Sequence, residues 1–170
     1  PVNVRLGFGE DGTFAFGEAN TFYTSDVILT ITAPAGATVY YTLDGTIPDS
    51  SSLKYTEPLT FKAHGGSFPD ATILRARAQD ALGRWSKTAA RTYLAGTKLE
   101  GRFSTVVFSL SGDPEELTEG PDGIFYGKNY ENRGRESERM VFAEAWEPDG
   151  TNIFEQFAGI RIYGGYSRRA

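Results

Sequence analysis

Apolar and polar residues alternate through much of the first half of the chain, and turn residues separate the alternating stretches. The apolar residues Val27, Leu29 and Ile31 are two apart, as in a strand with one buried face. Similar short stretches follow at residues 37–42, 55–61, 72–78 and 88–94. Short strands with a turn signal roughly every 8–12 residues are typical of an all-β sandwich.

The first twenty residues contain a hairpin signal of their own. Residues 10–13 read EDGT, a good turn sequence, and the apolar residues on both sides of it are spaced by two. We therefore expect a strand or hairpin arm over residues 1–20. The turn explains Glu10 and Asp11 better than a calcium site would.

The second half of the chain has a different pattern. Residues 97–102 are a short polar connection, too short for a free linker, so we expect the two halves to be in contact. Phe103–Leu110 is strongly apolar and predicts a strand that is buried on both faces. Two more strands are predicted at Met140–Trp146 and Phe157–Tyr163, with Trp146 in the core.

Composition and charge exclude several classes of site. The chain has 170 residues, 17 Lys plus Arg and 22 Asp plus Glu, and a net charge of −5, which disfavours a nucleic-acid partner. It has no cysteine, so disulfides, thiolate catalysis and cysteine-ligated metals are excluded. One histidine, His64, does not make a two-histidine metal site. No apolar run reaches the roughly 18 residues of a transmembrane segment, so we predict no membrane span and no metal site.

Part of the first half resembles a known family. Residues 34–49 read PAGATVYYTLDGTIPD and residues 54–59 read KYTEPL. This pattern resembles a fibronectin type III-associated module and the C-terminal sandwich of chitobiase and β-hexosaminidase. The resemblance covers about residues 20–95 and implies an immunoglobulin/fibronectin III-like sandwich over residues 21–96, used as a spacer or accessory domain. Within it we expect Asp44 and Gly45 to form a tight turn rather than a catalytic site.

The second half resembles the beginning of the spore-coat protein H (CotH) kinase-like domain. The matching segments are VVFSL at 106–110, DPEEL at 113–117, DGIFY at 122–126, ERMVFAE at 138–144 and AGIRIYGGYSR at 158–168. The resemblance implies that residues 103–170 are an incomplete, β-rich part of such a domain. It also implies an exported bacterial protein, secreted or on the cell surface, whose downstream kinase-like lobe is this chain's partner.

The kinase-like resemblance implies a phosphate-contacting loop. Glycines allow backbone N–H groups to approach phosphate oxygens, and arginine and serine side chains add hydrogen bonds. The residues implied are Arg161, Gly164, Gly165, Ser167 and Arg168. The lysine and metal-binding carboxylates of phosphoryl transfer would lie after Ala170. We therefore expect no catalytic residue and no cofactor in this chain, with ATP and Mg²⁺ implied only for the parent protein.

The acidic residues of the second half do not suggest an enzyme either. Asp113, Glu115, Glu116 and Glu119 are explained as a helix cap followed by a solvated acidic turn.

If residues 103–170 are an incomplete domain, they should expose apolar surface. We expect that surface around Val106, Phe108, Phe142 and Ile160.

A binding module is the alternative function. Carbohydrate-binding surfaces present aromatic rings, and we take Trp85 and Tyr40 as the candidates for a polysaccharide or cell-surface adhesion site. Tyr40 and Tyr41 point to opposite faces of one strand, so at least one of them should be exposed or at an edge. Most of the 23 aromatic residues (12 Phe, 9 Tyr and 2 Trp) must nevertheless be core. The preferred hypothesis is therefore a non-catalytic spacer or accessory module.

Overall fold

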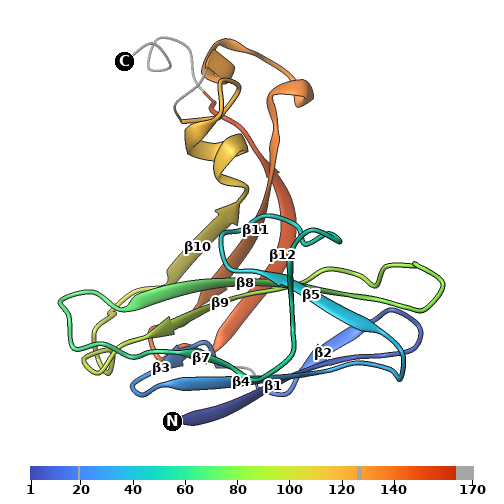
Figure 1. The fold of residues 1–170 in the computed structure, drawn as a ribbon. Coiled ribbons are helices and arrows are strands. Elements are labelled where there is room, and N and C mark those ends of the chain that lie inside the picture. Colours follow the sequence, from blue (N-terminus) through green and yellow to red (C-terminus); the bar gives the residue numbers. More distant parts are fainter. Residues whose placement is uncertain (19, 126–127, 164–170) are drawn as a thin grey trace.

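Three β-sheets make up the part of the chain that the computed structural model describes, residues 1–18, 20–125 and 128–163. Two of them form a sandwich, and the third stands upright on it (Figure 1). The predicted all-β fold is confirmed. Among these residues, no helix has the length and apolar character needed to cross a membrane.

The first sheet has the order β2-β1-β4-β7 and contains the N-terminal hairpin. Its strands are β1 (Val2–Phe8), β2 (Phe14–Phe16), β4 (Val27–Thr32) and β7 (Leu59–Phe61). The predicted turn joins β1 to β2, with Leu6 opposite Phe16 and the Gly9 N–H donating to the Thr13 carbonyl at 2.9 Å. Because β1 also pairs in parallel with β4, the hairpin is part of the sandwich.

The second sheet has the order β3-β9-β8-β5-β6. Its strands are β3 (Phe22–Tyr23), β5 (Thr38–Thr42), β6 (Leu53–Lys54), β8 (Asp70–Gln79) and β9 (Ala89–Ala95). The continuous strand predicted at 55–61 is wrong, because the chain passes from β6 in this sheet to β7 in the other. Pro58 lies in that passage, outside both sheets, so its lack of an N–H group interrupts no strand pairing. The Tyr55 hydroxyl accepts a hydrogen bond from the Ile31 N–H at 3.0 Å and so ties the passage to the first sheet.

The core of the sandwich lies between these two sheets. Alternation places Val27, Leu29 and Ile31 on the inner face of β4, where all three are buried as predicted. They pack against inward residues of the opposite sheet such as Leu74 and Tyr93.

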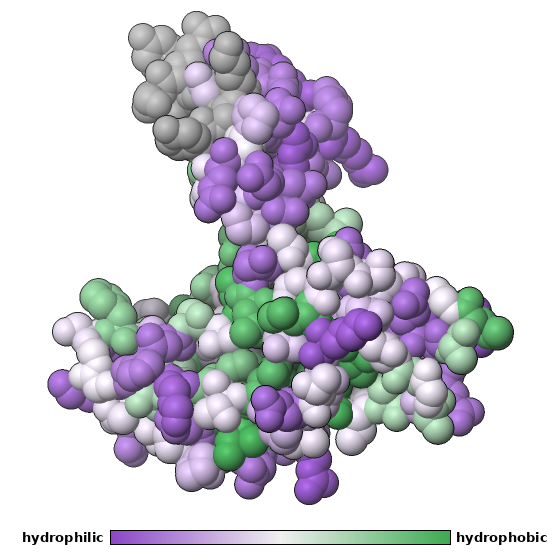
Figure 2. All heavy atoms as spheres, in the orientation of Figure 1, coloured by the Kyte–Doolittle hydropathy of each residue, from purple (hydrophilic) through white to green (hydrophobic). Residues whose placement is uncertain are grey.

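The third sheet has the order β10-β11-β12 and packs on the outer face of the second. Its strands are β10 (Val107–Gly112), β11 (Arg139–Trp146) and β12 (Asn152–Ile160). Short helical segments, η1 (Glu115–Glu119), η2 (Lys128–Glu131) and η3 (Arg135–Ser137), connect β10 to β11. Figure 2 shows hydrophobic residues gathered where this sheet meets the sandwich and hydrophilic ones over its far end.

β10 is not buried on both faces, contrary to the prediction. The sandwich covers the face with Val107, Ser109 and Ser111, whereas Phe108 and Leu110 on the other face are 67% and 56% exposed. The expected apolar surface is thus present at Phe108 and also at Val106.

Two of the residues expected in that apolar surface are not exposed. Phe142 points toward the sandwich and is buried against Phe157, with ring centroids 5.0 Å apart, and Ile160 is half-buried. The prediction that Phe142 belongs to an exposed apolar surface is therefore wrong.

Candidate functional site

The two aromatic residues predicted to bind carbohydrate are in contact. β5 places Tyr40 on the outer face of the second sheet, and Trp85 from the β8–β9 connection lies against it, with ring centroids 5.4 Å apart at 57°. The Arg77 guanidinium lies 4.5 Å from the Trp85 ring, and Lys54 Nζ lies 5.7 Å from the Tyr40 ring. Tyr40 is 7% exposed, so the half-buried Trp85 is the accessible ring of this pair.

The phosphate-contacting set falls mostly outside the described residues. Arg161 lies directly after β12 and forms an ion pair with Glu138, with Nη1 and Oε1 3.6 Å apart. Gly164, Gly165, Ser167 and Arg168 lie outside the described residues. This set stays a prediction.

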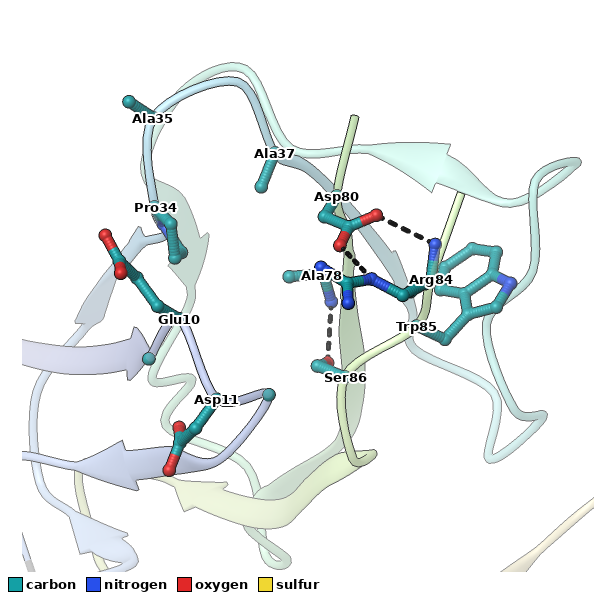
Figure 3. A pocket seen from close by; sticks show the side chains of 12 residues that line it. Glu10, Asp11, Pro34, Ala35, Ala37, Ala78, Asp80, Arg84, Trp85 and Ser86 are labelled. Atoms are coloured by element: carbon teal, nitrogen blue, oxygen red, sulfur yellow. Dashed lines mark hydrogen bonds and ion pairs between the residues drawn. The ribbon is translucent and has the colours of Figure 1, made fainter. Parts of the chain in front are cut away.

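Three turns enclose a cleft of about 520 Å³ at one end of the sandwich (Figure 3). Glu10 and Asp11 lie on one side of it and Asp80 and Arg84 on the other, while the Trp85 ring points away. Hydrogen bonds from Thr13 hold Asp11 in its turn and lower the pKa of that carboxyl.

On the other side of the cleft, Asp80 accepts from two backbone N–H groups and pairs with Arg84 Nε at 2.7 Å. The described residues contain no cluster of three or more His, Cys, Asp or Glu that would hold a metal. Asp11 and Asp80 accept hydrogen bonds within their own turns.

A second cleft, of about 500 Å³, lies where the sandwich meets the third sheet. The β5–β6 connection forms one wall, η1 forms another, and Arg75 of β8 lines it. Arg75 is 2% exposed; its Nη2 donates to the Ser111 carbonyl at 2.9 Å, and its guanidinium carbon lies 5.5 Å from the centroid of the Phe157 ring. The Nε–H of Arg75 has no hydrogen-bond partner among the described residues.

The turn predicted at Asp44-Gly45 forms one edge of this junction. As predicted, Gly45 has a positive φ of 90°, and Asp44 Oδ1 accepts from the Thr46 N–H at 3.0 Å. A side chain at Gly45 would also put its Cβ 2.3 Å from the Gly112 carbonyl oxygen at the end of β10. The glycine is needed both for its φ and for this close approach.

Sequence reasoning missed the buried acid that joins the third sheet to the sandwich. Glu144 of β11 is fully buried and accepts from the Thr92 N–H at 2.9 Å and from the Thr92 hydroxyl at 2.5 Å. Burial raises the pKa of Glu144, and the two Thr92 bonds oppose that rise. The available signal was an acidic residue in the middle of an otherwise apolar strand, Met140–Trp146.

An apolar cluster completes the junction. Trp146 packs with Phe22 and Leu99, and the Phe22 and Trp146 ring centroids are 5.7 Å apart. The prediction of Trp146 as a core residue is confirmed, and so is the contact between the two halves. Leu99 belongs to the short connection itself, which is therefore anchored rather than free.

Comparisons with known proteins support the sandwich. The family model described as chitobiase/beta-hexosaminidase C-terminal domain matches residues 18–90. Searches of curated proteins and of solved structures gave no match to the chain. The CotH kinase-like resemblance of residues 103–170 has no support from these comparisons.

Proposed function

We propose that this chain is a non-catalytic accessory module whose sandwich holds the three-stranded sheet in a fixed orientation for an adjoining domain. The observation that carries the proposal is the junction between them. It combines a buried acid bonded to the sandwich, an aromatic cluster and a glycine-to-backbone contact. Junctions built in this way resist hinge motion, whereas flexible spacers expose their connections.

The third sheet supports the same proposal through its other face. Phe108 and Leu110 leave that face apolar and exposed, as expected for a sheet that receives further structure. We propose that the adjoining domain is the kinase-like lobe of a secreted or surface-attached bacterial protein. ATP and Mg²⁺ would bind to that parent protein and not to this chain.

The orienting role can be tested by NMR relaxation. A rigid junction predicts one rotational correlation time for amides of the sandwich and of the third sheet. Two clearly different correlation times would overturn the proposal. Incubating the chain with ATP, Mg²⁺ and acceptor proteins tests the non-catalytic part, and phosphoryl transfer by this chain alone would contradict it.

Carbohydrate binding is the second candidate function. It is favoured by the Trp85–Tyr40 pair with its flanking cations, and by the family model, whose printed name refers to carbohydrate-processing enzymes. Loss of glycan binding in Trp85→Ala would place the site on this ring. Retained binding would place it elsewhere.

A further inference from the structure

A buried arginine, Arg75, lines the cleft between the β5–β6 connection and η1. A guanidinium has five N–H donors, and Arg75 uses one of them on Ser111. It forms no ion pair within the described part of the chain. A buried cation with unused donors is costly unless another group accepts from it.

The walls of the cleft carry acceptors of the opposite charge. Glu116 comes from η1, Asp113 from the segment just before it, and Asp49 from the β5–β6 connection. Asp113 Oδ1 accepts from the Glu115 N–H at 3.0 Å, which leaves its second oxygen for other donors. The hydroxyl groups of Thr46, Ser51 and Ser52 add further oxygens.

This mixture of groups discriminates between classes of ligand. The three carboxylates disfavour an anion, and the buried guanidinium weakens their attraction for a cation. A neutral molecule with several hydroxyl groups can donate to the carboxylates and accept from Arg75 at the same time. Ile47 and Met140 offer apolar surface for its C–H groups.

We propose that this cleft binds a neutral saccharide of one or two sugar residues, with Arg75, Asp113 and Glu116 as its main hydrogen-bonding partners. The volume of about 500 Å³ lies within the usual range of small-ligand sites. The inference rests on the carbohydrate-binding candidate above but places the site away from Trp85.

The experiment is an NMR titration of the isotope-labelled chain. Cellobiose and N,N′-diacetylchitobiose are the neutral probes, and inorganic phosphate and putrescine are the charged ones. A neutral disaccharide should shift the Arg75 guanidinium signals and the amide signals of Thr46 and Glu116. Phosphate and putrescine at the same concentration should not.

Conservative variants then locate the binding. Asn still caps a turn and Gln keeps the shape of Glu, so D113N/E116Q should remain folded while affinity falls about tenfold or more through loss of charge-assisted bonds. Glu119→Gln, an exposed change on the same turn, is the matched control and should bind like the wild type.

The outcomes distinguish binding in this cleft from carbohydrate binding elsewhere on the chain. Binding that survives D113N/E116Q but is lost in Trp85→Ala leaves carbohydrate binding in place and overturns the cleft as its site. No shift of the cleft signals with either disaccharide overturns the cleft as a saccharide site, whether or not Trp85 binds glycans. Preferential shifts with phosphate or putrescine would show that the cleft selects an ion and would also overturn the inference.

Discussion

Ionised carboxylates affect the stability of this chain in two opposite ways. Asp11, Asp44, Asp49, Asp80 and Asp149 accept hydrogen bonds within their own turns, which lowers their pKa values. Glu144 is buried between two sheets, which raises its pKa. The first kind is stabilising when ionised, and the second is costly when ionised.

These shifts predict how stability changes with pH. The contribution of the five aspartates is complete above their unfolded pKa near 3.8 and is lost as the pH falls through their lowered folded values. The cost of Glu144 is relieved as the pH falls through its raised folded pKa toward 4.5. Urea denaturation across pH should therefore show maximum stability in mildly acidic solution, with a steep loss in strong acid.

Glu144→Gln isolates the second contribution. Gln can accept from the Thr92 N–H through its carbonyl oxygen and donate to the Thr92 hydroxyl, so the junction bonds can be kept. Arg91 and Glu155 face the same site and are unchanged. The variant should gain stability relative to the wild type as the pH rises above 4.5. A difference that stays constant from pH 4 to 8 would contradict this account.

At the scale of elements, the junction depends on a close approach between the β5–β6 connection and β10. Gly45 has φ 90° and has the Gly112 carbonyl where a Cβ would be. Gly36 has φ 80°, but a Cβ there would meet nothing within 4 Å. An alanine at either position would be strained by the positive φ, but only at position 45 would its Cβ also collide with another segment.

The pair gives a matched test of that contact. Gly36→Ala should cost about 1 kcal/mol, the strain of a positive φ. Gly45→Ala should cost clearly more, about 2–4 kcal/mol, because the β5–β6 connection and the end of β10 must also separate locally. Equal losses in thermal denaturation would mean that the junction tolerates the extra carbon.

The exposed face of β10 makes another element-scale prediction. Phe108→Ser should change the free energy of unfolding by only about 0.5 kcal/mol, because this side chain already faces solvent. It should, however, reduce the binding of a hydrophobic dye such as ANS. Val141→Ala, at a fully buried position of β11, is the contrasting variant and should cost about 1 kcal/mol or more.

Much of the sandwich was predictable because its strands alternate and its turns carry strong local signals. The third sheet was harder to predict. Phe103–Leu110 has apolar residues at both odd and even positions, and only the placement of the sandwich decides that Phe108 is exposed while Ser111 is buried. The cleft was not predictable, because Arg75, Asp49 and Asp113 are brought together by contacts between distant segments. In the sequence, Asp113 and its neighbours look like a cap and an acidic turn.

At the scale of the whole molecule, the two tryptophans lie in different regions. Trp85 is half-buried on the sandwich, and Trp146 is buried in the junction. Each can report on its own region when the other is replaced by phenylalanine.

Coincident unfolding of the two regions is the expected result. Trp85→Phe leaves Trp146 to report the junction, and Trp146→Phe leaves Trp85 to report the sandwich. After correction for any change in overall stability measured by circular dichroism, both should follow the same cooperative transition. A junction that melts well before the sandwich would show that the third sheet is only loosely held.

The meeting of Gly45 with Gly112 has a consequence for protein engineering. A sandwich that ends in a free tail can be cut out and fused to a new enzyme as an interchangeable cassette. Here the sandwich would have to be transferred together with the third sheet. If either were replaced by a homologue with a bulkier residue at this contact, the sandwich and the sheet would be forced apart. Chimeras should therefore be spliced after β12, with both glycines inherited together, and not at the polar connection where the composition changes.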